Sequence, residues 1–452
     1  MRAKEEAFRI LETALSVASQ GVDDAEVALL GGQLGVSRFE ERGVVSSTEQ
    51  AAEMVSVRVL ARGRIVQVST SDFSREGIAE AAEEAKLRLS SLPPDPDPKS
   101  LPEPQNYAVV DAYDPETETT RALERAALAS RAVLRAKERG LRTEGFVAVG
   151  RGGIDLSGQL SPYAVANTRG LLAYHPETRV TMHVDFRSSE ERLGSARRSE
   201  VEVERIDADE LVQAALDEHD GAPEPLVTAG GTYRALLQPA AVGELIRFLG
   251  MTAGAGLAES GASFLSDRIG QPVCSSKVTL RDDFTHPLHR GAPFDVEGVA
   301  RKGVEIISNG IARSPVFAWE NATRLATEPT GHRQVLPALG EFEGAVHLVM
   351  DGDHLSVGEL LETLGTGVVI AGLESARLVE SQNVRITSGT RGGIRLYEEG
   401  HPVALGPCMR LDGSVLKMLS SVVALGEPCW TRGGVVPALV LEQVTLRPIR
   451  SF

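Results

Sequence analysis

Apolar residues recur at helical spacing at the start of the chain and then alternate with polar ones. Phe8, Leu11, Leu15 and Ala18 lie on one side of a helix drawn through the first twenty residues. Farther on, apolar positions alternate on both sides of a turn at Arg62-Gly63, which predicts a hairpin built on Val55, Val57, Val59, Val66 and Val68. The next helix begins after Ser74, a good N-cap, and its buried stripe is Ile78, Ala81, Ala82, Ala85 and Leu89.

Prolines mark the first boundary of the chain. Residues 92–107 are rich in proline, which disfavours helix and cannot donate to a strand ladder, so we predict an extended linker there. A second unit follows over 108–225, with a helix over about 117–138 begun by Asp114-Pro115, strands through Phe186, and a helix near 207–219. The first unit covers residues 1–91, and Gly221–Pro225 marks a further boundary.

The remaining segment, 226–452, is predicted to be rich in strands with a few packed helices. It begins with a strand at Tyr233–Leu237 and a helix over about 240–251, whose apolar stripe is Val242, Leu245, Ile246 and Leu249. Further helices are expected near 316–327, 356–364 and 412–420, and Ser356 with Glu359 forms a capping box. The pattern indicates an α+β fold: two related helix-and-antiparallel-sheet units, then a β-rich C-terminal domain.

Charge and composition narrow the class of protein. The 452 residues carry a formal net charge of -16, which argues against nucleic acid as a partner because phosphate binding requires a basic face. No run of about 18 apolar residues is present, so we expect no membrane span, and acidic residues interrupt the first helix, which argues against a signal peptide. The cysteines Cys274, Cys408 and Cys429 are odd in number and widely spaced, which fits the reducing cytoplasm.

Metal-ligand patterns are weak. In the segment Arg281–His289, His286 and His289 lie close to Asp282 and Asp283, but Pro287 favours a loop, and solvated loop residues are the simpler interpretation. His354 follows two acidic residues in what reads as the turn before the Ser356 helix.

Nucleophilic and cofactor motifs are equally sparse. Cys429 lies in a turn-rich stretch, but a reactive thiolate needs a base or a positive field beside it, so a passive cysteine is the simpler interpretation. No serine falls in G-x-S-x-G, and the glycines of Gly254–Gly261 follow a helix, which predicts a loop and not a phosphate site. We therefore predict no catalytic, cofactor-binding or metal-ligating residue in this chain.

An ordered set of short motifs gives the chain a family resemblance. Phe294-Asp-Val-Glu-Gly298 is followed by Glu305–Gly310, Trp319-Glu-Asn-Ala322 and Glu328-Pro-Thr-Gly331, and it is preceded by Ser263-Phe-Leu265, Gly270 and Val278–Asp283. Ser69–Asp72 and Asn167–Gly170 add matches in the first half. Each motif is short, but their succession over nearly the whole chain resembles the TldD/PmbA family.

The resemblance also shows where this chain lacks a metal-binding motif. In the metal-bearing TldD branch of this family, a helix of the C-terminal domain carries H-E-x-x-x-H, and a later cysteine supplies a third ligand. The equivalent stretch here, Gln238–Thr252, contains no histidine, and Cys429 stands near the place of that cysteine. The chain therefore resembles the PmbA branch, also called TldE, which implies a cytosolic, metal-free subunit paired with a TldD-type subunit that hydrolyses peptides.

Three functional hypotheses follow. The first is a non-catalytic subunit of a metallopeptidase complex, which clamps an extended or unfolded peptide by strand addition to a sheet edge. The second is a stand-alone hydrolase that uses Cys429 or the group Asp282, His286 and His289. The third is a homodimeric peptide-binding or scaffold protein without a proteolytic role. The sequence does not identify the peptide, the partner subunit or the pathway.

Overall fold

The computed structural model describes residues 2–93, 100–154, 156, 160–188, 193–220, 229–336 and 340–449. The first half of the chain forms one antiparallel eight-stranded sheet in the order β3-β2-β1-β4-β7-β8, with β5 beside β1 and β6 beside β5. Its strands are β1 (Asp24–Glu40), β2 (Gly43–Ala61), β3 (Arg64–Thr70), β4 (Arg142–Gly152), β5 (Pro162–Asn167), β6 (Leu172–Tyr174), β7 (Thr178–Arg187) and β8 (Leu193–Glu200). The predicted hairpin is confirmed, because β2 and β3 are joined at Arg62-Gly63, both with positive φ.

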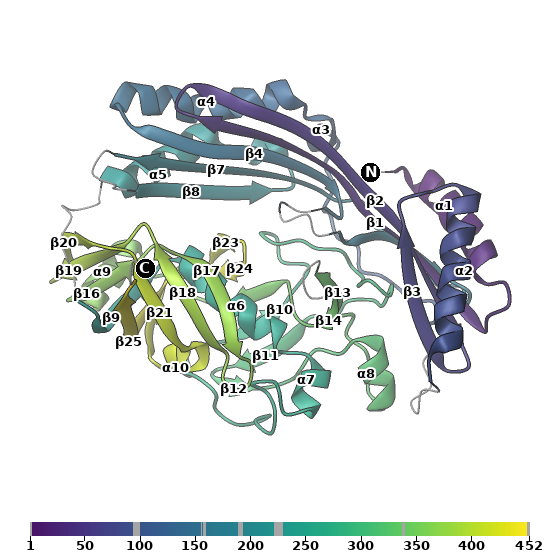
Figure 1. The fold of residues 1–452 in the computed structure, drawn as a ribbon. Helices are drawn as coiled ribbons and strands as arrows, with labels where there is room; N and C mark the ends of the chain where they lie inside the picture. The colour runs from purple at the N-terminus through teal and green to yellow at the C-terminus, as the bar shows by residue number, and fades with distance from the viewer. Residues whose placement is uncertain are drawn as a thin grey trace.

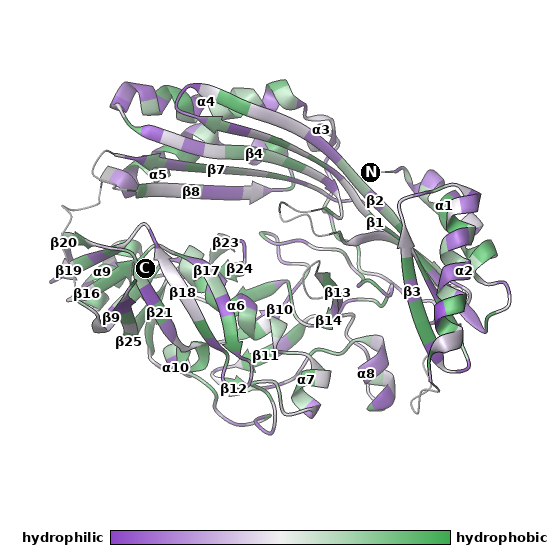
Figure 2. Cartoon of the chain, in the orientation of Figure 1, coloured by the Kyte–Doolittle hydropathy of each residue, from purple (hydrophilic) through white to green (hydrophobic). Residues whose placement is uncertain are grey.

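Two pairs of helices cover this sheet at opposite ends of its long strands (Figure 1). Helices α1 (Lys4–Ala18) and α2 (Arg75–Ser91) pack on β1, β2, β3 and β5, whereas α4 (Ala122–Arg139) and α5 (Ala208–Asp220) pack on β4, β7, β8 and the far halves of β1 and β2. Figure 2 shows hydrophobic and hydrophilic residues interleaved along these helices, as one-sided burial requires. Two hydrophobic clusters result, one beneath each pair.

The long strands make the two N-terminal units parts of one sheet. β1 pairs with β2 along its whole length, with β5 over one half and with β4 over the other. Residues 1–91 and 108–225 therefore contribute strands to one sheet, although the division at the linker stays a prediction. Of that linker, residues 94–99 lie outside the described residues, as does the predicted boundary at Gly221–Pro225.

The predicted helix over 117–138 is interrupted. α3 (Pro115–Thr119) is capped by Asp114 and ends at Thr120, and α4 begins anew after Arg121, whose backbone is extended. The Arg151 guanidinium donates to the carbonyl oxygens of Glu118 and Thr120, which a continuous helix would use internally. A side chain from a strand thus splits the helix.

The C-terminal half contains a nine-stranded sheet and a six-stranded sheet around one large hydrophobic cluster. The nine-stranded sheet comprises β9 (Gly231–Leu237), β16 (Gly367–Ile370), β17 (Gly372–Glu380), β18 (Arg385–Arg391), β19 (Ile394–Glu398), β20 (His401–Gly406), β21 (Met409–Ser414), β22 (Val422–Leu425) and β25 (Leu439–Pro448). The six-stranded sheet comprises β10 (Leu280–Asp282), β11 (Val304–Ser308), β12 (Ile311–Ala312), β15 (Leu348–Met350), β23 (Cys429–Thr431) and β24 (Gly434–Val436). A separate hairpin joins β13 (Arg333–Leu336) to β14 (Gly340–Glu343).

Helix predictions in this half are confirmed with shorter bounds. α6 (Pro239–Met251) buries the predicted stripe, and α9 (Val357–Leu364) begins with the predicted Ser356–Glu359 capping box. α8 (Trp319–Arg324) and α10 (Val415–Ser420) are shorter than expected, and α10 starts late because β21 occupies residues up to Ser414. The predicted loop Gly254–Gly261 is wrong, since α7 (Ala255–Glu259) forms within it. The α+β fold class is confirmed, and no helix in the described ranges is long and apolar enough to cross a membrane.

Candidate functional site

The motif loop around Asp295 is folded by its own aspartate. Asp295 Oδ1 accepts hydrogen bonds from the amides of Glu297 and Val299, both at 3.0 Å, and Oδ2 accepts from the amide of Arg333 at 2.9 Å. Gly298 completes the turn with φ 72°, and a Cβ there would lie 2.7 Å from the Leu171 side chain. Glycine is required both by the backbone and by the contact.

This loop joins the C-terminal half to the N-terminal sheet through a buried ionic bridge. Arg58 on β2 contacts Glu26 on β1 at 2.9 Å and Glu297 in the loop at 3.0 Å. The side chains are 11%, 1% and 4% exposed, respectively. Tyr107 adds a second tie, because its hydroxyl donates to the Gly298 carbonyl oxygen at 2.7 Å.

The bridge holds more carboxylates than one guanidinium neutralises. Burial raises the pKa of Glu26 to about 8, opposed by Arg58 and reinforced by Glu297 and Asp295. Burial, together with Glu297, raises the pKa of Asp295 to about 7. The junction therefore retains a proton near neutral pH, which reduces the repulsion among its carboxyl groups.

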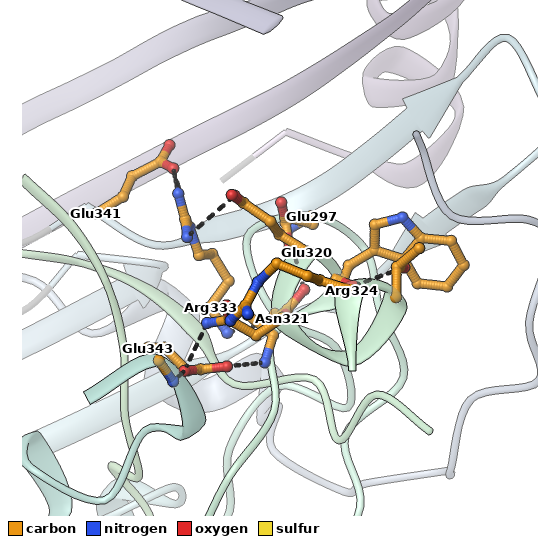
Figure 3. A network of polar contacts seen from close by, with 12 residues as sticks. Glu297, Glu320, Asn321, Arg324, Arg333, Glu341 and Glu343 are labelled. Atoms are coloured by element: carbon orange, nitrogen blue, oxygen red, sulfur yellow. Dashed lines mark hydrogen bonds and ion pairs between the residues drawn. The ribbon is translucent and has the colours of Figure 1, made fainter. Parts of the chain in front are cut away.

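A second network fixes the helices next to this loop (Figure 3). Arg333 on β13 pairs with Glu341 on β14 at 2.8 Å and lies 4.0 Å from Glu320 on α8. Glu343 accepts from the amides of Ala318 and Gly256 at 2.6 and 2.8 Å, and from the side chain of Asn321 at 2.9 Å. One carboxylate thus caps the start of α8 and of α7 together.

The interpretation of the segment around Asp282 as solvated loop residues is wrong for Asp282, which is the centre of a buried cluster. Asp282 is fully buried, contacts His332 at 3.2 Å, and accepts from the amides of Val346 and His347, both at 2.8 Å. Burial by itself raises the pKa of the Asp282 carboxyl. The charge of His332 and its hydrogen bond to Asp282 outweigh burial and hold that pKa well below its usual range. His332 comes from a distant segment, so sequence spacing gave no sign of it.

The predicted histidines flank this cluster. The His289 ring lies 5.2 Å from that of His347, and burial lowers the pKa of His289 to about 3. His286 accepts from the Leu288 amide within a turn, as its segment predicted. His354 is exposed in the loop before α9. Among the described residues, no group of three or more His, Cys, Asp or Glu side chains is placed to hold a metal ion.

Helix α6, which stands where the family resemblance places a metal motif and which has no histidine, is packed in the hydrophobic core. Ala241, Val242, Leu245, Ile246 and Leu249 on α6 are each 0% exposed. The helix begins at a proline, and its two charged residues, Glu244 and Arg247, pair with each other at 2.7 Å.

Cys429 lies beside this helix. A Cβ on Gly243 would lie 2.2 Å from Thr431 Oγ1, so the β23–β24 hairpin packs directly on the α6 backbone, and β23 begins at Cys429. The Cys429 side chain is exposed, yet the protein packed around its sulfur and the nearby Glu427 raise the pKa of the thiol. A protonated thiol is a poor nucleophile.

Two other motifs serve structure. Asn167 Oδ1 accepts from the amides of Arg169 and Leu171, and its Nδ2 donates to the Pro102 carbonyl oxygen, which fixes the linker. Asp72 accepts from the Ser74 amide before α2. Sequence reasoning identified these motifs, but it missed Glu26, Arg58 and Glu343, whose partners lie far away in the chain.

Comparison with known proteins agrees with this architecture. Residues 230–447 match the PmbA/TldA metallopeptidase C-terminal domain. The chain is 26% identical to the metalloprotease PmbA of Escherichia coli O157:H7 over 95% of its own length and 93% of that protein. It is also 26% identical to a metalloprotease of Methanothermobacter thermautotrophicus, over 59% of its own length and 60% of that protein.

The fold has a counterpart among solved structures. The crystal structure of TldE from Thermococcus kodakarensis superposes with a TM-score of 0.84, at 18% identity, over 97% of this chain and all of that one. Fold, ordered motifs and the domain match concur. Residues 230–447 belong to the C-terminal domain family of the PmbA/TldA metallopeptidases, and the chain as a whole is similar to TldD/PmbA proteins.

Proposed function

We propose that this chain is a non-catalytic, metal-free subunit of a cytoplasmic TldD/TldE-type metallopeptidase complex that acts on unfolded or extended peptides. In the proposal, a TldD-type partner supplies the metal and the hydrolytic chemistry, and this chain contributes peptide-binding surface. The chain is thus a pseudoenzyme subunit of a heterodimer.

The packing of α6 is the observation that carries the proposal. A catalytic zinc site needs three protein ligands and an open position for water. α6 offers no imidazole, its inward face is apolar and sealed against the core, and Glu244 is already paired with Arg247. Cys429 beside it is a single donor with a raised pKa. These residues do not fit a metallopeptidase metal, so no hydrolytic step is assigned to this chain.

A reconstitution experiment tests the proposal. The purified chain, a TldD-type protein from the same genome, and an equimolar mixture are assayed on unfolded peptides with and without a chelator, and mixed complexes are measured by sedimentation. We expect activity and a heterodimer only with the partner present, and loss of activity on chelation.

Two outcomes contradict it. Chelator-sensitive activity of this chain alone, abolished by Cys429→Ala or His289→Ala, would instead indicate a stand-alone hydrolase. A stable homodimer that forms no mixed complex would indicate a scaffold protein. Arg131→Gln, an exposed change on α4, serves as the matched control for each variant.

A further inference from the structure

Strand β2 has a long outer edge without a partner strand. β3 covers that edge only from Val55 to Ala61, and in the described parts of the chain no strand pairs with it from Gly43 to Met54. Residues 44–51 are all exposed. A register shift on the β1 side falls next to Val45, so the regular edge runs from Ser46 to Met54. It contains neither lysine nor proline, the residues that usually block edge pairing.

The edge is closed at one end and open at the other. Val55 pairs with Thr70, the last residue of β3, so an added strand cannot continue past Met54. In the other direction the edge runs out to the β1–β2 turn. A strand that lies parallel to β2 must therefore end, or turn away, beside residues 50–54.

A cavity opens beside the closed end of this edge. Its volume is about 640 Å³, and its lining combines residues of β1, β2 and β4 with the α3–α4 corner. The polar side chains around it are Gln33, Glu49, Gln50, Glu118, Arg121 and Arg151. The cavity lies over the sheet from β2 across β1 to β4, so a strand added to the outer edge of β2 would run beside its β2 border, and the end of that strand would enter the cavity by turning over the sheet.

Two arginines, Arg121 and Arg151, line the cavity, and a third, Arg125, is buried outside its lining and contacts Glu49. Arg125, 0% exposed, contacts the Glu49 carboxylate at 2.7 Å, and Arg151, 9% exposed at the side chain, lies 3.6 Å from it. Arg125 is held from behind, because its Nε donates to Ser37 Oγ at 3.1 Å. The Arg121 side chain at the rim is exposed and makes no ion pair with any residue that the structure describes. The Glu49 side chain itself is 53% exposed.

Glu49 is thus a half-exposed carboxylate that already lies between two fixed guanidinium groups. We propose that the outer edge of β2 and this arginine cavity form a binding site for the C-terminal end of an extended peptide. The peptide backbone pairs in parallel with Ser46–Met54, and its terminal carboxylate turns into the cavity, where it displaces Glu49 and meets Arg121 and Arg151, with the charge of Arg125 behind them. Arg121 can donate two parallel hydrogen bonds to a carboxylate, whereas Arg151, whose Nε and Nη2 already donate to the carbonyl oxygens of Glu118 and Thr120, offers its charge and Nη1.

A peptide terminus fits these observations better than a second copy of the chain. A β2 strand from another copy would bring its own Glu49 and Glu53 and no free carboxylate terminus, and it would not stop at the closed end. The inference rests on the proposed function in that it names where on this chain a peptide lies. Its test uses this chain alone, so a failure here leaves the partner role intact, and a failed reconstitution leaves this site intact.

Fluorescence anisotropy tests the site directly. The probe is a ten-residue peptide with uncharged side chains (Ser, Thr and Val), a neutral N-terminal fluorophore and a free C-terminal carboxylate, which is its one charge. We expect amidation of the C-terminus to weaken binding about tenfold, as loss of a charge-assisted contact does. Arg121→Gln should weaken the free-acid peptide about tenfold and leave the amide unchanged, whereas Arg131→Gln on the same helix should alter neither.

Two further measurements separate recognition from general structural damage. Glu49→Gln removes the competing carboxylate and should tighten binding of the free-acid peptide. A pocket that was merely destabilised would bind the peptide more weakly instead. Peptides N-methylated at alternate residues should lose binding for one alternation and keep it for the other, since only one set of amides faces β2. Hydrogen exchange should slow at residues 46–54. Equal binding of acid and amide, or protection that depends on protein concentration without peptide, would overturn the site.

Discussion

The Glu26→Gln substitution tests whether the ionic bridge holds a proton. Glu26 lies 1% exposed beside Arg58, Glu297 and Asp295, and its pKa rises from an ordinary value of 4.5 to about 8 because burial favours the neutral form. A carboxyl with a raised pKa stabilises the fold while protonated. That contribution is fully present below pH 4.5 and is lost as the pH rises through 8.

The size of the effect follows from the pKa. At pH 6 the Glu26 carboxyl is ionised in the unfolded chain but protonated in the folded chain, where it ionises only near pH 8. The unfolding free energy therefore falls over about two pH units between pH 6 and pH 9. At about 1.4 kcal/mol per unit, the free energy of unfolding falls by about 3 kcal/mol from this group alone. The glutamine variant copies the neutral acid, so this loss should be absent from it.

Urea unfolding at pH 6 and pH 9, followed by circular dichroism and tryptophan fluorescence, measures the difference. Coincident transitions by the two probes are required before free energies are compared. Glu40→Gln, at the exposed end of the same strand, is the matched control and should follow the wild type. If wild type and Glu26→Gln lose stability in parallel between pH 6 and pH 9, the buried carboxyl is ionised throughout and the reasoning fails.

Three more substitutions probe the junction and its neighbours. Arg58→Met removes the counter-charge of Glu297 and a hydrogen-bond donor to Glu26, and it should cost about 3 to 5 kcal/mol of unfolding free energy, measured by urea titration; a loss below about 1 kcal/mol would contradict the bridge. Gly298→Ala should lower the melting temperature more than Gly261→Ala, because both glycines have positive φ but an added Cβ meets other atoms only at Gly298. Equal shifts in melting temperature would mean that backbone strain is the whole effect and that the contact with Leu171 costs nothing. Asp282→Asn should destabilise the fold at pH 7 and flatten its acid unfolding, because a depressed carboxyl pKa stabilises at neutral pH and that stability is lost on acidification; an unchanged acid midpoint would refute it.

Local patterning determined the elements of this protein. The stripes of α2 and α6, the Arg62-Gly63 turn and the Ser356 capping box follow from interactions within a few residues, so they are visible in the sequence. The order of the motifs likewise identified the family, and the missing histidines of Gln238–Thr252 needed no coordinates.

Tertiary structure decided where those elements meet. The bridge joins Arg58 to Glu297 across 239 positions, and Asp282 finds His332 where the spacing had suggested His286 and His289. No periodicity encodes such contacts, because a buried charge is placed by the packing of other elements around it. The break before α4 has the same origin: a strand's arginine takes the carbonyl oxygens that the helix would have used, and local propensity carries no sign of it.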